Sequence, residues 1–307
     1  VTLRCVVTTG AEQETFVYQN LILNDPFTVY LMSYFDSGAD TTGLRLGYSY
    51  DGINWMPLNG GEPVLAATMG SRSVRDPNIF RLKDGNFGIV ATQGWDYPTI
   101  YAWDSPDLIT FENERLLKIQ GTTTEKWNSN RTMFGFDSSI ASGGSAWAPE
   151  AIYSPEKGAY LIYWSDTHSN GGTHAPIMGN WTTDLTNETL SDPFVLYDVD
   201  DYQMIDANII KEDGTYVMTV KNDYHTVSGA TSPVIKRFEM STGETLGYNS
   251  FVPASTDAII TGIAASNGAI HDIEGASAFK NLHPAADGSD RYIMYFDPLG
   301  GGDSDLA

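Results

Sequence analysis

Short apolar runs separated by turn-forming pairs recur along the chain, and long helical periodicity is absent. Four such turns pair a Gly with a preceding Asp or Lys, at Asp84-Gly85, Lys157-Gly158, Asp213-Gly214 and Asp287-Gly288. A pair of this kind between two strand-like apolar runs is a strong hairpin signal. The pattern therefore predicts four β-hairpins distributed over most of the chain.

Further strands are predicted beside these hairpins. A third strand is expected at residues 99–103, 175–179 and 234–238, and an earlier unit has strands at 28–35 and 44–48. A polar corner of similar pattern follows both the early unit and the next one, at residues 49–55 and 105–111. Short strands with frequent Gly and many aromatic residues favour an all-β fold.

A unit of three or four strands that repeats about five times predicts a five-bladed β-propeller, in which small sheets surround a central channel. We expect residues 1–307 to form a single catalytic β-propeller domain. The last unit shows only two clear strands. Either the natural protein continues beyond Ala307, or the ring closes irregularly with the N-terminal strands.

A carboxylate stands at the start of the first strand of each hairpin unit. These residues are Asp76, Glu150, Asp206 and Glu274. Acids at the same place in successive repeats meet if the repeats surround an axis. Such a group suits hydrolysis of sugar bonds, because inversion needs a protonated acid at the leaving oxygen and an ionised carboxylate to activate water. A single Asp at a strand start is more often a turn residue, so the argument depends on the set.

Composition narrows the class of partner. The formal net charge is −22 with only 17 Lys and Arg, which argues against nucleic acid or an anionic membrane and suits a neutral oligosaccharide or polysaccharide. Cys5 is the only cysteine, so an internal disulfide and a cysteine zinc site are excluded. The apolar runs are much shorter than the roughly 20 residues of a membrane span.

No cofactor is required by these patterns. The five histidines show no metal-ligand spacing. The acidic stretch at residues 198–201 offers oxygen ligands for a structural calcium ion, although such a stretch is more often a solvated loop. The chain begins with Val and has sequons at Asn130, Asn180 and Asn187, so we expect an extracellular or periplasmic monomer from which a leader was removed.

Four motifs in chain order resemble glycoside hydrolase family 43, the five-bladed propellers that cleave arabinofuranosyl and xylosyl linkages. They are Arg75-Asp76-Pro77, Trp147-Ala148-Pro149-Glu150, Ile205-Asp206-Ala207 and Glu274-Gly275-Ala276-Ser277. The chain departs from the family pattern at Ala276, where proline is usual. The resemblance implies that Asp76 is the general base, Asp206 the aspartate that modulates pKa values, and Glu274 the general acid.

The same resemblance suggests substrate-binding residues. Trp147 and Trp95 are expected to form walls that stack on sugar, although aromatic residues also fill propeller cores. Glu150 is either a supporting acid in the pocket or a structural hydrogen-bonding residue. Arg75 is expected to offset the charge of Asp76, which would keep that base ionised.

The implied activity is that of an inverting, exo-acting glycoside hydrolase that removes a terminal pentose, with α-L-arabinofuranose the first choice. β-Xylosidase and β-galactofuranosidase activities use the same apparatus. The polar insertion at residues 121–145 is expected to wall off one end of the pocket. Two other classes stay open: a retaining fructan hydrolase, suggested by Asn24-Asp25-Pro26 with Arg75-Asp76-Pro77, and a sugar-binding propeller without catalysis.

Overall fold

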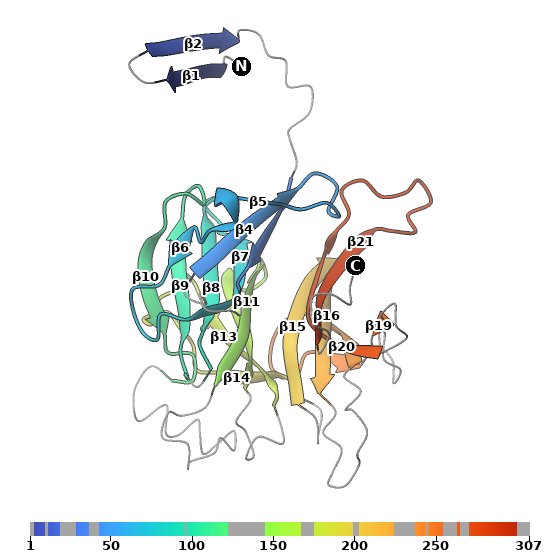
Figure 1. Ribbon diagram of the computed structural model, residues 1–307. Helices are drawn as coiled ribbons and strands as arrows, with labels where there is room; N and C mark the ends of the chain where they lie inside the picture. Colours follow the sequence, from blue (N-terminus) through green and yellow to red (C-terminus); the bar gives the residue numbers. More distant parts are fainter. Residues whose placement is uncertain are drawn as a thin grey trace.

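The computed structural model describes residues 3–9, 12–18, 29–36, 43–95, 97–121, 145–166, 175–198, 203–223, 237–243, 245–253, 263–264 and 270–299. Over these residues the fold is all-β, with one short 3-10 helix, η1 (Asn59–Gly61). Strands β1 (Leu3–Thr9) and β2 (Glu12–Tyr18) form an antiparallel hairpin that lies apart from the other sheets (Figure 1).

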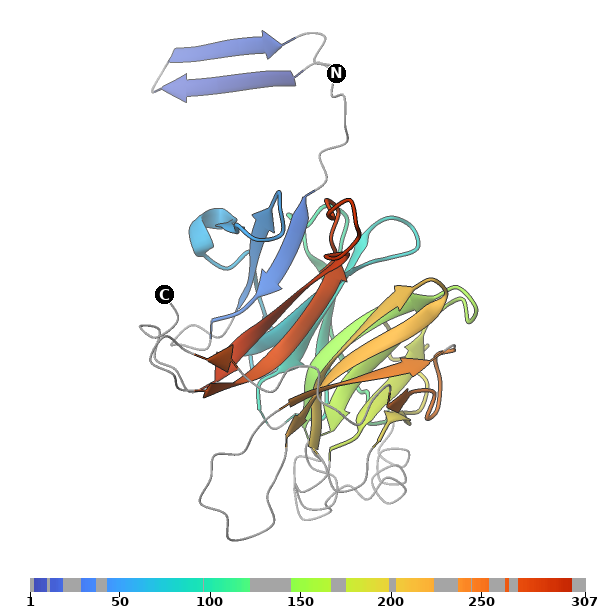
Figure 2. The ribbon, with the colours of Figure 1, turned by 90° about the vertical axis from the view of Figure 1, so that its right-hand side faces the viewer.

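Five antiparallel sheets form the blades of a β-propeller (Figures 1 and 2). Blade 1 contains β3 (Tyr30–Tyr34), β4 (Gly43–Ser49), β5 (Met56–Pro57) and β6 (Leu65–Ala66), and blade 2 contains β7 (Val74–Arg81), β8 (Phe87–Gln93), β9 (Ile100–Ser105) and β10 (Glu112–Leu117). Blade 3 contains β11 (Ala146–Ser154), β12 (Ala159–Asp166), β13 (Ile177–Thr182) and β14 (Phe194–Tyr197), and blade 4 contains β15 (Gln203–Glu212), β16 (Thr215–Asp223), β17 (Arg237–Gly243) and β18 (Val252–Pro253). Blade 5 contains β19 (Ile263–Ala264), β20 (Ile270–Lys280) and β21 (Tyr292–Leu299).

The predicted strands agree with these elements. The four predicted hairpins are β7–β8, β11–β12, β15–β16 and β20–β21, and the early unit is blade 1. Within each of blades 2 to 4 the strands pair in chain order, and the first strand of each blade lies against its counterpart in the next. We call the opening strand of the main hairpin in each blade its first strand and the strand that pairs with it the second; in blade 5 these are β20 and β21, and the short β19 precedes them. The first strands β3, β7, β11, β15 and β20 therefore surround the axis of the propeller.

The hydrophobic core lies between neighbouring blades. One buried cluster joins blades 1 and 2 around Leu44, Val74 and Trp103. A second joins blades 2 and 3, and a third joins blades 3 and 4 around Tyr163 and Met218. Since each sheet buries both faces against its neighbours, its strands read as continuous apolar runs such as that of β12.

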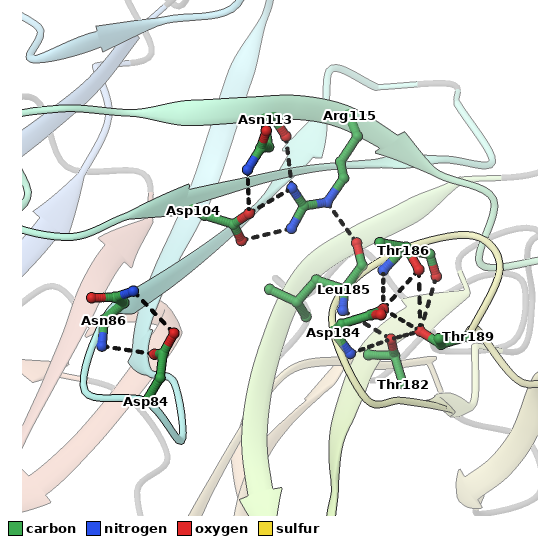
Figure 3. A network of polar contacts seen from close by, with 10 residues as sticks. All are labelled: Asp84, Asn86, Asp104, Asn113, Arg115, Thr182, Asp184, Leu185, Thr186 and Thr189. Carbon is green, nitrogen blue, oxygen red and sulfur yellow. Dashed lines mark hydrogen bonds and ion pairs between the residues drawn. The ribbon is translucent and has the colours of Figure 1, made fainter.

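Polar corners shape the outer edge of the blades. In the corner after β9, the Asp107 carboxylate accepts hydrogen bonds from the backbone N–H groups of Ile109 and Thr110. Arg115 on β10 pairs with Asp104 on β9 and donates through Nε to the backbone oxygen of Leu185 in blade 3, at 2.6 Å (Figure 3). The corner thus turns the chain from β9 into β10, and Arg115 links blade 2 to blade 3 at the outer rim.

Blade 5 lies against blade 1, and side chains join the two (Figure 2). The hydroxyl of Tyr295 donates to the backbone oxygen of Gly52 at 2.7 Å, and the hydroxyl of Tyr30 accepts from the N–H of Leu282 at 2.6 Å. The ring of Phe279 packs against Tyr30 and lies parallel to Tyr295. We call these contacts, with Trp55 beside them, the aromatic seam.

Several predictions concern residues with little or no description. The insertion expected to wall the pocket, most of the acidic stretch proposed for calcium, and the sequon at Asn130 lie outside the described residues. Asn180 is described and fully buried: its side chain accepts from the indole of Trp164 and donates to the backbone oxygen of Ile119, so its sequon is inaccessible in the folded chain. None of the described helical segments has the length and apolarity to cross a membrane.

Candidate active site

The first strands of blades 2 to 5 each carry a β-bulge at the same register. The pairing with the second strand shifts after Arg75, Trp147, Ile205 and Glu274. The next residue in each strand has positive φ: Asp76 (46°), Ala148 (44°), Asp206 (54°) and Gly275 (65°). Bulges bend a strand and re-aim its side chains. Asp is among the residues that tolerate positive φ, whereas most side chains are strained there.

The bulges correct one prediction. Asp76 and Asp206 occupy the first bulge position, but Glu274 precedes its bulge and Glu150 follows the first bulge residue, Ala148, by two positions. The four acids are therefore not at equivalent places in the repeat, although they lie on equivalent strands. The sequence does not reveal this offset, because a bulge adds a residue without leaving a pattern of its own.

A single cavity of about 700 Å³ brings the predicted site residues together. It is lined by all seven of them, Arg75, Asp76, Trp95, Trp147, Glu150, Asp206 and Glu274. Blades 2 to 5 supply these side chains, and blade 1 completes the wall with residues of β3. The cavity therefore lies at the axis of the propeller, where the first strands converge.

Asp76 is surrounded by groups with opposing effects on its charge. Burial raises its pKa above the ordinary value, and the nearby Glu274 carboxylate adds to this effect. A hydrogen bond from Thr92 and the positive charge of Arg75 act in the other direction. Thr92 is oriented for this, because its Oγ1 accepts from the N–H of Ala148 at 2.8 Å and its own proton remains to be donated. The net direction is upward, so Arg75 offsets the burial only in part.

Asp206 lies in an environment that favours its protonated form. Burial raises its pKa to about 7, and the charges of Asp76 and Glu274 contribute to the rise. The ammonium of Lys221 lowers it, and so does the hydrogen bond that Oδ2 accepts from the N–H of Gly275, at 3.1 Å. A carboxyl group with this pKa is substantially protonated near neutral pH.

Glu274 forms an ion pair with a fully buried lysine. The Nζ of Lys221 lies 2.5 Å from Oε2 of Glu274, and the Lys221 side chain has no exposed surface. Lys221 stands opposite Ile205 on β16, so it reaches across from blade 4 to the first strand of blade 5. This ion pair anchors the Glu274 carboxylate at the wall of the cavity.

Glu150 belongs to a network that ties blades 3 and 4. Its Oε2 accepts from the hydroxyl of Tyr163 at 2.5 Å and from Nδ2 of Asn208 at 3.0 Å. Tyr163 in turn accepts from the N–H of Ile209 at 3.0 Å. Burial raises the pKa of Glu150 to about 7. Because Oε2 of Glu150 already accepts two hydrogen bonds from the protein, this geometry favours a structural role for Glu150 while leaving it at the cavity wall.

Aromatic residues form a ledge at the cavity edge. The guanidinium of Arg75 lies 4.2 Å from the ring centre of Trp95 and 4.8 Å from that of Phe35. Trp147 meets Trp95 edge to face, and its indole N–H donates to the backbone oxygen of Trp95 at 2.8 Å. Trp95 is 57% exposed, so its ring is available to a ligand rather than buried in the core.

Several cavity residues were not anticipated from sequence. Asp297 lines the cavity, as do Trp55, Phe279 and Tyr295 of the aromatic seam. Lys221 is fully buried on β16 and reaches the site through its ion pair with Glu274. Asp297 could have been found from the sequence, because it ends the last apolar run, at residues 292–297. Its register with Glu274 depends on the bulge, which the sequence does not show. Among the described residues, no group of three or more His, Cys, Asp or Glu is arranged to hold a metal ion.

A five-bladed propeller with carboxylates around an axial cavity defines the class of propeller glycosidases. The sequence profile of a family described as a probable glycosyl hydrolase domain, related to glycoside hydrolase family 43, matches residues 25–304. The chain belongs to this family. No curated protein matches it in sequence.

Solved structures share the fold at low sequence identity. An endo-1,4-β-xylanase of Bacteroides thetaiotaomicron superposes with a TM-score of 0.56 and 14% identity, covering 91% of this chain and 89% of its own. An endo-arabinase of the same organism gives 0.56 and 14%, with 90% of each chain covered. A family 93 α-L-arabinofuranosidase of Fusarium graminearum, solved with arabinobiose, gives 0.53 and 13%, covering 88% of this chain and 71% of its own. At these identities the likeness concerns the fold alone.

Proposed function

We propose that the protein is an inverting, exo-acting glycoside hydrolase that removes a terminal pentose, with α-L-arabinofuranose the favoured sugar. In this proposal Asp76 is the general base, Glu274 the general acid, and Asp206 the carboxyl group that tunes both. The single observation that supports it most is the convergence of these three residues, from three different blades, on one axial cavity.

The electrostatics of the three acids suit a shared proton. Each of Asp76 and Asp206 has its pKa raised by burial and by a neighbouring carboxylate. When carboxyl groups interact in this way, each titration step is a property of the group of acids and not of a single residue. With a pKa of about 7, Asp206 holds a proton near neutral pH beside Glu274. The set therefore retains a proton for the leaving oxygen while one member stays ionised.

The proposed step is a single displacement at the anomeric carbon. Asp76 accepts a proton from a water molecule whose oxygen bonds to that carbon. The bond to the leaving oxygen breaks, and this oxygen takes its proton from Glu274, which in turn receives the proton that the three acids hold on Asp206. The product sugar has the opposite anomeric configuration. Arg75 and Thr92 favour the ionised form of Asp76, which is the form that a base requires.

The choice of sugar draws on the relatives and on the ledge. Structures of similar fold include an endo-arabinase and an α-L-arabinofuranosidase, and also a xylanase. The exposed Trp95 and the adjoining Trp147 suit stacking on a sugar face. β-Xylosidase and β-galactofuranosidase activities remain the alternatives, because xylopyranose is a pentose of different ring size and configuration and galactofuranose carries one further hydroxymethyl group.

The test is a panel of nitrophenyl glycosides with the wild-type chain and with Asp76→Asn and Glu274→Gln. We expect α-L-arabinofuranoside to be the best substrate and each variant to lose roughly 100- to 10,000-fold in kcat, since each lacks an acid–base group. Asn tolerates positive φ, so Asp76→Asn preserves the bulge. The matched control is Glu112→Gln on the exposed face of β10, which should keep full activity.

Unchanged turnover in Asp76→Asn or Glu274→Gln would remove that residue from the mechanism. NMR of the first-formed anomer separates inversion from the retention expected of a fructan hydrolase. Binding of arabino-oligosaccharide without any release of reducing sugar would instead establish a sugar-binding propeller.

A further inference from the structure

One side chain of the cavity breaks the repeat of the propeller. In each of blades 2 to 5, one residue of the second strand pairs with the residue just before the bulge of the first strand. In chain order these second-strand residues are Thr92, Ser165, Lys221 and Asp297. These four residues are therefore structural equivalents. Each lies on the second strand of its blade, at the end near the axis.

Three of the four equivalents interact with the bulge region of the next blade. Thr92 accepts a hydrogen bond from the N–H of Ala148 at 2.8 Å. Ser165 accepts from the N–H of Asp206 at 3.3 Å. Lys221 donates to Glu274. In each case the polar side chain of one blade forms a hydrogen bond with the first strand of the next blade around the ring.

Asp297 faces a different neighbour. The blade that follows blade 5 around the ring is blade 1, and its strand β3 pairs with β4 without a register shift from Tyr30 to Tyr34. Among the described residues, no N–H or O–H group donates to the Asp297 carboxylate. The pKa of Asp297 is raised by partial burial and by the Glu274 carboxylate, which stands directly opposite.

This arrangement leaves an acceptor without a donor beside Glu274. Like charges directly opposite across two strands are destabilising, so the pair is costly to the fold unless a ligand supplies donors. Asp297 lines the cavity and is open to it. A sugar ring presents hydroxyl groups, which are donors, whereas a neutral sugar adds no charge.

We propose that Asp297 is a substrate-binding residue that accepts hydrogen bonds from ring hydroxyls of the sugar held next to Glu274, and so helps to determine which sugar is cleaved. This inference rests on the proposed glycosidase function and assigns a specificity role to blade 5. A site built to bond a hydroxyl group discriminates strongly against an analogue that lacks it, because the acceptor is then left unpaired.

The experiment compares Asp297→Asn and Asp297→Ala with the wild type on the best nitrophenyl pentoside and on its monodeoxy analogues, each lacking one hydroxyl. For the complete sugar we expect Asp297→Ala to raise KM by roughly 10- to 100-fold, the size of a lost hydrogen bond to a charged acceptor, with little change in kcat. For the analogue lacking the bonded hydroxyl, wild type and variant should perform alike. Asp287→Asn, an exposed turn residue on the same hairpin, is the control and should behave as wild type.

Equal losses on the complete sugar and on every analogue would overturn the proposal, and so would unchanged KM or a fall in kcat alone. A binding measurement separates it from the catalytic proposal: arabino-oligosaccharide is titrated into Asp76→Asn with and without Asp297→Asn. If the wild type binds sugar but hydrolyses none, the hydrolase proposal fails, and a roughly tenfold weaker binding by the double variant still supports the role of Asp297. If no sugar binds, both proposals fail.

Discussion

The propeller is held together at its axis in two different ways. From blade 2 to blade 5, a polar side chain of each blade accepts a hydrogen bond from the first strand of the next blade: Asn78 from the N–H of Ala151, Tyr163 on β12 from that of Ile209, and Asn208 from that of Ala278. We call these contacts the polar hub. Between blades 5 and 1, the aromatic seam replaces it.

The polar hub positions the carboxyl groups of the cavity, whereas the aromatic seam closes the ring. In the polar hub the donor N–H groups lie three residues after the first bulge position in blades 3, 4 and 5, so the hydrogen bonds hold the bulges, and with them Asp76 and Asp206, in fixed relation. The aromatic seam contributes apolar burial and few directional contacts. It joins the two ends of the ring without any exchange of strands among the described residues, and it leaves Asp297 open to the cavity.

The largest effect expected is the pH dependence of stability that the buried carboxyl groups beside the polar hub cause. The pKa of Asp206 is about 7 in the folded chain against an ordinary 3.8, so the folded state binds more protons than the unfolded state between these values. Stability therefore falls as pH rises from about 4 to above 7, by on the order of 4 kcal/mol for this group. Glu150, with a pKa of about 7, contributes in the same direction.

Thermal unfolding of the wild type and Asp206→Asn between pH 5 and pH 8 measures this effect. The variant lacks the buried charge and keeps the positive φ, so it should unfold at a higher temperature than the wild type at pH 8, and the two should converge toward pH 5. Glu112→Gln should follow the wild type. Parallel curves for wild type and Asp206→Asn would contradict the assignment of a raised pKa.

A smaller effect is expected from a single hydrogen-bonding residue of the hub. Asn208→Ala leaves the N–H of Ala278 and an oxygen of Glu150 without this partner in a buried setting. We expect the free energy of unfolding to fall by about 2–3 kcal/mol, measured by urea denaturation. Asn54→Ala, at an exposed corner where water replaces the lost partner, should cost less than about 1 kcal/mol. Equal costs for the two variants would mean that the hub does not depend on Asn208.

The smallest of the three effects concerns the aromatic seam. Phe279→Ala removes a partly buried ring that packs on Tyr30 and Tyr295, and we expect a loss of about 2 kcal/mol in the free energy of unfolding, without any change in its pH dependence. Ile109→Ala, at a side chain that is 82% exposed, serves as control and should be neutral. If Phe279→Ala is also neutral, the seam does not close the ring in solution.

Much of the architecture was predictable because it depends on local patterns. The Asp84-Gly85 and Lys157-Gly158 turns lie between β7 and β8 and between β11 and β12, as expected of a hairpin signal. The site was predictable to the level of strands: Asp76, Glu150, Asp206 and Glu274 lie on four first strands and line one cavity. Their roles in catalysis remain predictions.

The rest depends on contacts between residues distant in sequence. The offset of Glu150 and Glu274 relative to Asp76 follows from bulges, which leave no periodic signal. The ion pair of Lys221 with Glu274 joins residues of different blades, and no feature near either residue predicts it.

The strand repeat, the turns between strands and the acids on the first strands can be read from the chain alone, because they depend on neighbouring residues and on short-range turn geometry. Assembly of the blades sets which backbone N–H meets which side chain across the axis, and so which carboxylates have partners and which face the cavity. The physical reason is that burial and the carboxylates of other strands raise the pKa values of Asp76, Asp206 and Asp297, and both arise only when the strands are assembled.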